Sequence, residues 1–288
     1  MGEEKRGERP QASVVAREWL CESIRRLSGR DALLALTSPT RVMSTSANSP
    51  AEPSHPAPGP TRNRLLAALP APQFEELQSQ TEKIELATGE DIALPGTPWT
   101  HVYFPENCIF SVVNEMRDGA TVEVGTIGNE GVAGLPALMD ATTSESRMFS
   151  QLAGSAWRVP VSAVVSMMER DREVRRFINR YAQAYLSQVS QGAACNRLHG
   201  IEQRCARWLL LTRDRVDSDR FSLKQEFLSE MLGVRRAGVS VAASALQDAG
   251  LIRYSRGVIE VLDREGLLAA SCECYAVIRE QFDRLVPS

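Results

Sequence analysis

Residues 225–252 read QEFLSEMLGVRRAGVSVAASALQDAGLI, and this stretch decides the fold. Gly233 can adopt the left-handed backbone conformation that commonly ends a helix. A first helix is therefore expected from about Leu223 to Leu232. Ser222 is its expected N-cap, and Gln225 three positions later completes a capping-box pattern.

A second helix is expected to begin at Arg235, directly after the turn at Gly233 and Val234. Val239 and Leu246 are apolar at positions where this helix would pack against the first one. Two helices joined by a short glycine turn form a helix-turn-helix. The expected second helix starts with two arginines, and arginine can donate two hydrogen bonds to guanine in the major groove.

The next segment, residues 250–262, reads as a strand, a tight turn and a second strand, which predicts a wing. Cationic and hydroxyl side chains near its tip suit phosphate contacts, which position a protein on DNA without reading sequence. Gly238 either permits close approach of the backbone to DNA or is merely tolerated, at a cost of about 1 kcal/mol relative to alanine. The residues expected at the DNA surface are Arg235, Arg236, Gly238, Ser240, Val241, Ser244, Arg253, Tyr254 and Arg256.

Composition limits the other possibilities. The chain has 288 residues, 43% hydrophobic and 24% charged, and a net charge of −3, so nucleic-acid binding requires a local basic patch. It has no apolar run near the roughly 20 residues of a membrane helix and no signal-peptide pattern, which favours a cytoplasmic protein without membrane contact. Six scattered cysteines favour reduced thiols. No phosphate-binding loop or nucleophile elbow occurs, so an enzyme is not expected.

The N-terminal segment differs in composition from the rest. Residues 38–61 are dominated by Pro, Ser and Ala, and we expect residues 1–61 to be a disordered extension and linker. A short helix from Arg17 to Leu36 would be isolated by that linker. Translation starting at Met43 is an alternative that would remove residues 1–42.

Residues 62–165 are expected to form a small β domain. A short helix pair around Leu65 and Leu77, interrupted at Pro70 and Pro72, precedes it. Short β-rich segments separated by turn residues then follow between residues 82 and 160, which favours an antiparallel sandwich or barrel.

Residues 166–215 are expected to form a long helix. Apolar residues recur at intervals of three and four, among them Val174, Ile178, Tyr181 and Leu198. A helix of this length has more apolar surface than a small barrel covers, so we expect a parallel seam with a second copy of the chain. A core helix in a monomer is the alternative.

The order of barrel, long helix and winged helix resembles the Crp/Fnr family of bacterial transcription regulators. The segments Asn196–Leu210 and Glu226–Arg236 carry the resemblance most specifically, and it covers about residues 62–280. It implies an α+β fold with a double-stranded β-helix, a jelly-roll-like sensor of the cyclic-nucleotide-binding type, and a winged helix-turn-helix at residues 216–288. It further implies a homodimer on an inverted repeat of double-stranded DNA, with RNA polymerase as a partner. The alternative is a ligand- or protein-binding scaffold that uses the winged helix for interaction.

The sequence departs from the family pattern at two places. Arg236 keeps the position of a base-reading arginine, but Ala237 and Val241 replace a glutamate and a second arginine. In the sensor, Glu130 and Gly131 stand in reversed order and Arg147 is displaced by a few residues. These three remain candidate effector residues for an anion, but a vestigial pocket and a surface arginine are favoured. No cyclic nucleotide is therefore expected, and the effector is left unassigned.

Metal and haem sites are also not expected. Cys21 stands alone where family members with an iron–sulfur cluster carry a cysteine group, and His101 at a strand start is more typical of a structural residue than of a haem ligand. Cys195 and His199 are four apart on one helical face, which suits two metal ligands, but a seam cysteine and a solvated histidine are favoured. Cys272 and Cys274 are also assigned no site, because close neighbours on a helix diverge.

Overall fold

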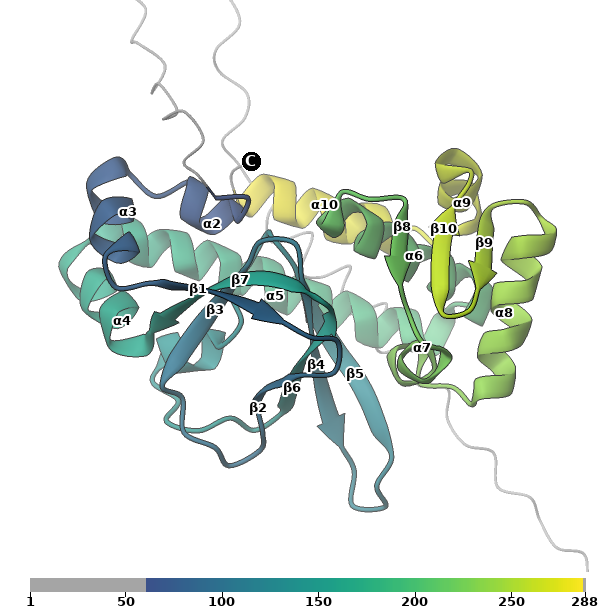
Figure 1. The fold of residues 1–288 in the computed structure, drawn as a ribbon, viewed down its shortest axis with the longest axis horizontal. Coiled ribbons are helices and arrows are strands. Elements are labelled where there is room, and N and C mark those ends of the chain that lie inside the picture. The colour runs from purple at the N-terminus through teal and green to yellow at the C-terminus, as the bar shows by residue number, and fades with distance from the viewer. Residues whose placement is uncertain (1–60, 287–288) are drawn as a thin grey trace, which may run out of the picture. The chain divides into compact units, whose positions relative to one another are not determined.

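The computed structural model of the protein describes residues 61–286, apart from the side chain of Arg236 (Figure 1). The expected extension before residue 61, with its isolated helix, Cys21 and the alternative start at Met43, lies outside the described residues. Thr61 is already included in the fold, since its hydroxyl donates a hydrogen bond to the Glu106 carboxylate.

The N-terminal β domain consists of two antiparallel sheets, ordered β1-β7-β3 and β2-β6-β4-β5. The strands are β1 (Glu82–Leu86), β2 (Asp91–Ala93), β3 (His101–Pro105), β4 (Ile109–Glu115), β5 (Thr121–Ile127), β6 (Arg147–Leu152) and β7 (Gly154–Pro160). The central strand β4 is buried over its first five residues, whereas the edge strand β1 is mostly exposed and carries charged residues. Charges on an edge oppose pairing with other chains. The expected antiparallel β domain is confirmed.

Short helices surround these sheets. They are α2 (Arg64–Ala67), α3 (Ala71–Gln78), the 3-10 helix η1 (Leu135–Met139) and α4 (Val161–Arg170). The expected helix pair before the sheets is therefore present, and Pro70 is the N-cap of α3. Asn63 begins α2, because its side chain accepts hydrogen bonds from the amides of Leu65 and Leu66.

The expected single helix over residues 166–215 is broken into α4, α5 (Arg172–Leu198) and α6 (Ile201–Val216). Asp171 is extended and caps α5, accepting hydrogen bonds from the amides of Glu173 and Val174. His199 and Gly200 are also extended, and they separate α5 from α6. Apolar periodicity continues through both breaks, which is why the sequence predicted one helix.

Part of the apolar face expected as a seam along α5 is covered within this chain, and the seam with a second copy stays a prediction. Val174, Ile178 and Tyr181 are buried in the main core. Helix α10 (Cys274–Leu285) packs along α5, and the rings of Tyr181 and Phe282 lie 6.4 Å apart. Periodicity shows that a face is apolar but does not say what covers it.

The C-terminal region is a winged helix-turn-helix. Its elements are β8 (Arg220–Ser222), α7 (Gln225–Leu232), α8 (Arg236–Asp248), β9 (Ile252–Ser255), β10 (Val258–Val261) and α9 (Arg264–Ala270), followed by α10. Ser222 is not the N-cap of α7, as the sequence predicted, because it pairs with Val258 in the sheet β8-β10-β9. Lys224 is the N-cap instead, and Gly233 ends α7 with a φ of 58°.

Helix α7 also contacts the N-terminal β domain. The rings of Phe227 on α7 and Phe149 on β6 lie 5.6 Å apart with an interplanar angle of 31°. Among the described helices, none is both long enough and apolar enough to cross a membrane.

Candidate nucleic-acid interface

Helix α8 has one buried face and one exposed face. Val239, Ala242 and Leu246 are buried in the core of the winged helix, where small and branched residues fit against α6 and α7. The opposite face carries Ala237, Ser240, Val241 and Ser244, all exposed. Val241 is 62% exposed although it is apolar. This face presents short side chains, which allow a surface to approach the helix backbone closely.

The two arginines stand at the N-terminus of α8, as the sequence predicted. Arg235 is the N-cap, it is exposed, and its carbonyl accepts hydrogen bonds from the amides of Gly238 and Val239. Arg236 is the first residue of the helix. The start of a recognition helix is the region that contacts base edges in many helix-turn-helix proteins.

Gly238 is best explained by packing within the protein. A Cβ atom at this position would lie 3.2 Å from Cδ1 of Ile201, the first residue of α6, and 3.7 Å from Val234. The glycine therefore keeps the α6–α8 crossing close. Of the two interpretations made from the sequence, close approach to DNA gains no support from this geometry.

The wing ends in a two-residue turn. Ser255 pairs with Val258, and Arg256 and Gly257 between them have φ values of 51° and 75°. Positive φ at both central residues is the mark of a type I′ turn, whose twist matches that of the flanking strands. Arg256 is thereby held at the tip, where it lines a surface hollow with Lys224. This hollow lies between the wing and the start of α7, and it brings two cations together.

Two other wing residues are used inside the protein. The Tyr254 hydroxyl donates a hydrogen bond of 3.0 Å to the Leu223 carbonyl, and burial raises the pKa of this phenol. Arg253 forms an ion pair of 2.6 Å with Glu260 on the neighbouring strand. The sequence placed both residues among the phosphate contacts, but in this structure their polar groups have partners within the protein.

The three candidate effector residues do not form one site. Glu130 is buried and pairs with Arg215 at 2.8 Å, while the amide of Gly128 donates to the same carboxylate. A Cβ atom at Gly131 would lie 2.5 Å from the Tyr181 ring of α5, so the backbone is packed directly on that ring. Glu130 is therefore paired within the protein, and the Gly131 backbone is packed on an aromatic ring.

Arg147 lies apart from them at the start of β6. It forms an ion pair of 2.7 Å with Asp91, and its guanidinium stacks 4.5 Å from the centre of the Phe149 ring. The interpretation of Arg147 as a surface residue therefore agrees with its position. His101 begins β3 and shares a hydrogen bond of 2.9 Å with the Thr100 hydroxyl, as expected for a structural histidine.

A hollow that the sequence did not indicate lies where β5, α5 and α6 meet. Its lining includes Glu123, Gln188, Arg207 and Trp208. Burial raises the pKa of the Glu123 carboxyl to about 7, although the Ser111 hydroxyl and the Gln151 amide donate to it at 2.6 and 2.8 Å. Its lining comes from residues more than 60 positions apart in the chain, so no local signal could have identified it.

Comparisons with known proteins agree with this architecture. Residues 203–270 match the family model of the Crp-like helix-turn-helix domain. No curated protein sequence shows significant similarity to the chain.

Several solved structures have a similar fold, among them regulators of the Crp/Fnr and CRP families. FixK2 from Bradyrhizobium japonicum superposes with a TM-score of 0.58 at 17% identity, covering 67% of this chain and 98% of that one. A putative Crp/Fnr-family regulator from Eubacterium rectale gives a TM-score of 0.56 at 17% identity, with 70% and 94% covered. A CRP-family regulator from Thermus thermophilus gives 0.56 at 19% identity, with 66% and 96% covered.

The β domain, the helices α5 and α6 and the winged helix follow one another in the order expected from the sequence. Residues 203–270 thus form a Crp-like helix-turn-helix domain, and the chain shares the fold of solved Crp/Fnr regulators. The resemblance drawn from its sequence, and the expected α+β fold, are confirmed.

Proposed function

We propose that the chain binds an inverted-repeat operator as a homodimer and that α8 reads the bases of each half-site. The observation that carries this proposal is the arrangement of α8. One face is fixed in the core, the other is exposed and lined by Ser240, Val241 and Ser244, and Arg235 and Arg236 stand at its start. Because chromosomal DNA is the ligand, we place the protein in the cytoplasm, with RNA polymerase as a further partner.

Arg236 is the proposed base reader. We expect Arg236→Ala to relax the preference at one position of each half-site, with a loss of about 1 to 3 kcal/mol of discrimination. The measurement is binding to a panel of operators that differ at one base pair. Arg256→Ala is the matched control, since a wing arginine that contacts phosphate should weaken binding to every sequence equally. An equal loss for Arg236→Ala on all operators would instead make Arg236 a phosphate contact.

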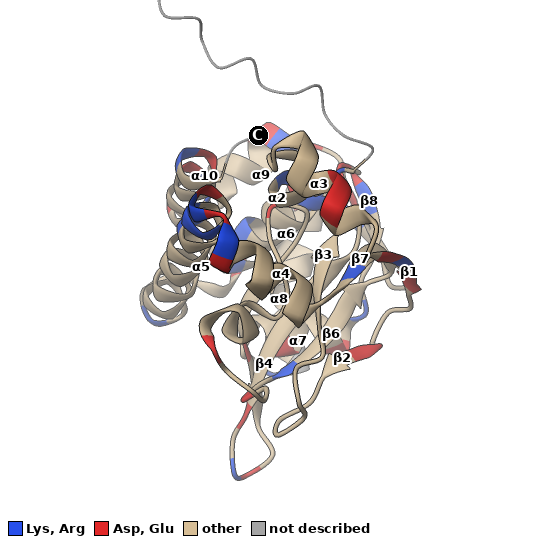
Figure 2. Ribbon diagram, turned by 90° about the vertical axis from the view of Figure 1, so that its left-hand side faces the viewer, with Lys and Arg blue, Asp and Glu red and all other residues tan. Residues whose placement is uncertain are grey.

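The proposed dimer uses the outward face of α5. Residues 181–196 contain no charged side chain, whereas Arg172, Glu173 and Arg175 put both signs of charge near the start of the helix (Figure 2). On this uncharged stretch and just beyond it, Leu186 is 65% and Leu198 is 76% exposed. An exposed leucine at position 186 on a stretch without charges suits a helix-to-helix contact between two copies. Of the residues expected in the seam from the sequence, Leu198 is exposed, whereas Val174, Ile178 and Tyr181 are buried within the chain.

Selection of bound DNA from a random pool tests the proposal, using the purified full chain at physiological salt. Recovery of an inverted repeat with half-site centres about one helical turn apart would support a dimeric operator reader. Sedimentation of the same sample gives the mass of the complex. Binding should weaken steeply as salt rises, because each neutralised phosphate releases counterions.

A ligand- or protein-binding scaffold is the second candidate function. The contacts of Tyr254 and Arg253 favour it, because the polar groups of both side chains already have partners within the protein. Failure to enrich any DNA sequence, with and without small-molecule effectors, would reject the operator proposal and favour the scaffold.

A further inference from the structure

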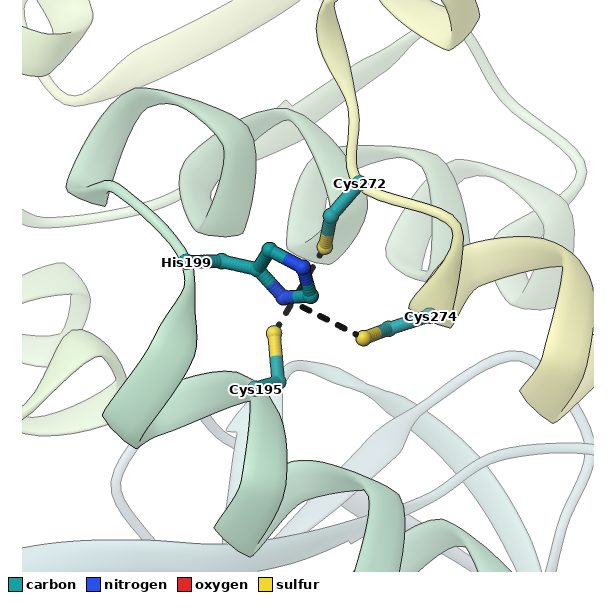
Figure 3. Close-up of side chains that lie close together, drawn as sticks. All are labelled: Cys195, His199, Cys272 and Cys274. Atoms are coloured by element: carbon teal, nitrogen blue, oxygen red, sulfur yellow. Dashed lines mark hydrogen bonds between the residues drawn. The ribbon is translucent and has the colours of Figure 1, made fainter.

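Four potential metal ligands meet at the break between α5 and α6 (Figure 3). We call them the cysteine–histidine cluster: Cys195, His199, Cys272 and Cys274. Cys195 is in the last turn of α5 and His199 is the C-cap of that helix. Cys272 lies between α9 and α10, and Cys274 begins α10. The three thiols are buried, and the histidine side chain is 18% exposed.

The distances within the cluster are those of ligands around one small ion. Cys195 Sγ and Cys272 Sγ are 3.5 Å apart, as are Cys274 Sγ and His199 Nδ1. All four ligand atoms lie within 4.8 Å of one another. Zinc binds thiolate sulfur at about 2.3 Å and imidazole nitrogen at about 2.0 to 2.1 Å, so a tetrahedron around it has edges of about 3.5 to 3.8 Å.

We propose that the cysteine–histidine cluster binds one tetrahedral zinc ion through three thiolates and one imidazole nitrogen. Three cysteines and one histidine form a closed set of four protein ligands, which is typical of structural zinc sites. Binding releases the thiol protons to solvent, and the site then carries one net negative charge. An iron–sulfur cluster inserts its own iron and sulfide ions between the thiolates and so needs wider spacing than this cluster provides.

Neighbouring residues orient the proposed ligands. The imidazole of His199 directs Nδ1 towards the cluster and places Nε2 3.2 Å from the Glu273 carboxylate. A carboxylate on the second nitrogen is a common partner of metal-bound histidine, because it fixes the ring and raises its basicity. The amide of Gln191 donates a hydrogen bond of 3.0 Å to Cys274 Sγ, which suits a thiolate better than a thiol.

A purely apolar interpretation of the cluster explains less. The three cysteines form a small group separate from the two larger hydrophobic cores. Buried thiols alone would pack against aliphatic side chains and would not require an imidazole held by a carboxylate. The Cys195–Cys272 distance also exceeds the roughly 2.05 Å of a disulfide bond.

The proposed ion has a structural consequence for the helices. Cys195 and Cys272 are separated by 77 positions in the chain, and one ion would cross-link them. It would hold the end of α5 against the link between α9 and α10 and would thereby fix the break at His199 and Gly200. The ordering of a long loop by one ion contributes directly to folding stability.

The first test is metal analysis of the full chain, purified under reducing conditions without chelator. We expect one zinc ion per chain, and replacement by Co²⁺ should give the visible bands of tetrahedral cobalt with thiolate charge-transfer absorption. Cys272→Ala and Cys274→Ala should lose the ion. Cys205→Ala is the matched control, since Cys205 is equally buried but lies outside the cluster.

A second measurement does not depend on the folding of any variant. Alkylation of the wild-type chain, read out by peptide mass spectrometry, should spare the three cluster cysteines when zinc is bound and modify them after chelation. The proposal is overturned if the chain binds no zinc after reconstitution, if it holds iron with labile sulfide, or if Cys205→Ala loses the metal equally.

Discussion

The pairs Glu130–Arg215 and Arg253–Glu260 are built from the same groups at nearly the same separation, 2.8 and 2.6 Å, in opposite environments. The side chains of the first pair are 6% and 7% exposed, at the contact between the β domain and α6. Those of the second are 62% and 38% exposed, on the wing. Inside the protein each charge is stabilised mainly by its partner. On the wing, water can solvate either charge when the partner is removed.

The buried pair also belongs to a larger network. The guanidinium of Arg215 donates to the Thr126 hydroxyl, and at 2.7 Å to the side-chain oxygen of Gln188. Through these contacts Arg215 joins α6 to β5 and to α5. The wing pair has no comparable role, because it connects two strands that are already paired in their backbones.

The largest effect is expected from Arg215→Leu. This change leaves the Glu130 carboxylate buried without its partner, so we expect a loss of about 3 to 5 kcal/mol in the free energy of unfolding. Chemical denaturation measures it. The double variant Glu130→Leu with Arg215→Leu should recover much of the loss, because no uncompensated charge remains. A loss below about 1 kcal/mol for the single variant would show that Glu130 is solvated or protonated.

Glu123 adds a third environment to this comparison. It is a buried carboxyl group like Glu130, but the side chains that donate to it, such as Ser111 and Gln151, are neutral. Its folded pKa of about 7 lies above the usual value of 4.5, so the folded state retains the proton to higher pH. The contribution to stability is fully present below about pH 4.5 and is lost as pH rises towards 7. We expect this loss to be on the order of 1 to 3 kcal/mol.

Glu123→Gln should remove this pH dependence and stabilise the protein at pH 8. Ser111 and Gln151 donate to the same oxygen of the Glu123 carboxylate, so the amide oxygen of glutamine can accept from both. The measurement is the free energy of unfolding of wild type and variant, from chemical denaturation at pH 5 and pH 8. Parallel behaviour of the two proteins would mean that Glu123 titrates normally.

The smallest effect is expected from Arg253→Ala. An exposed pair contributes about 0 to 1 kcal/mol, and added salt should reduce even that. Thermal unfolding at low and high salt provides the measurement. A loss of stability comparable with that of Arg215→Leu would contradict the view that water replaces the lost partner of this exposed pair.

Local signals explain what the sequence could predict. The turn at Gly233, the hairpin tip at Arg256 and Gly257, and the apolar inner face of α8 each lie within a few residues, and all are present. The N-cap of α7 was the exception. Ser222 has the right residue type for capping, but pairing with Val258 from a distant strand takes precedence.

Long-range contacts explain which features the sequence could not predict. Cys195 and His199 have the spacing of two ligands on one helical face, but the other two members of the cluster follow more than 70 residues later. Likewise, the apolar face of α5 gives no indication that α10 covers it. The spacings of Cys195 with His199 and of Cys272 with Cys274 were local signs of the two halves of the cluster, but neither indicated that the halves meet.

The contact between Phe149 and Phe227 opposes displacement of helices α7 and α8 from the β domain. These two helices are joined by the turn at Gly233 and share a hydrophobic core, so we expect them to move as a rigid body. Any rotation of that body away from the β domain must first separate the two stacked rings, at a cost of about 0.5 to 1.5 kcal/mol beyond the exposed area. The free energy of this ring contact therefore adds to what any separation of α7 and α8 from the β domain requires.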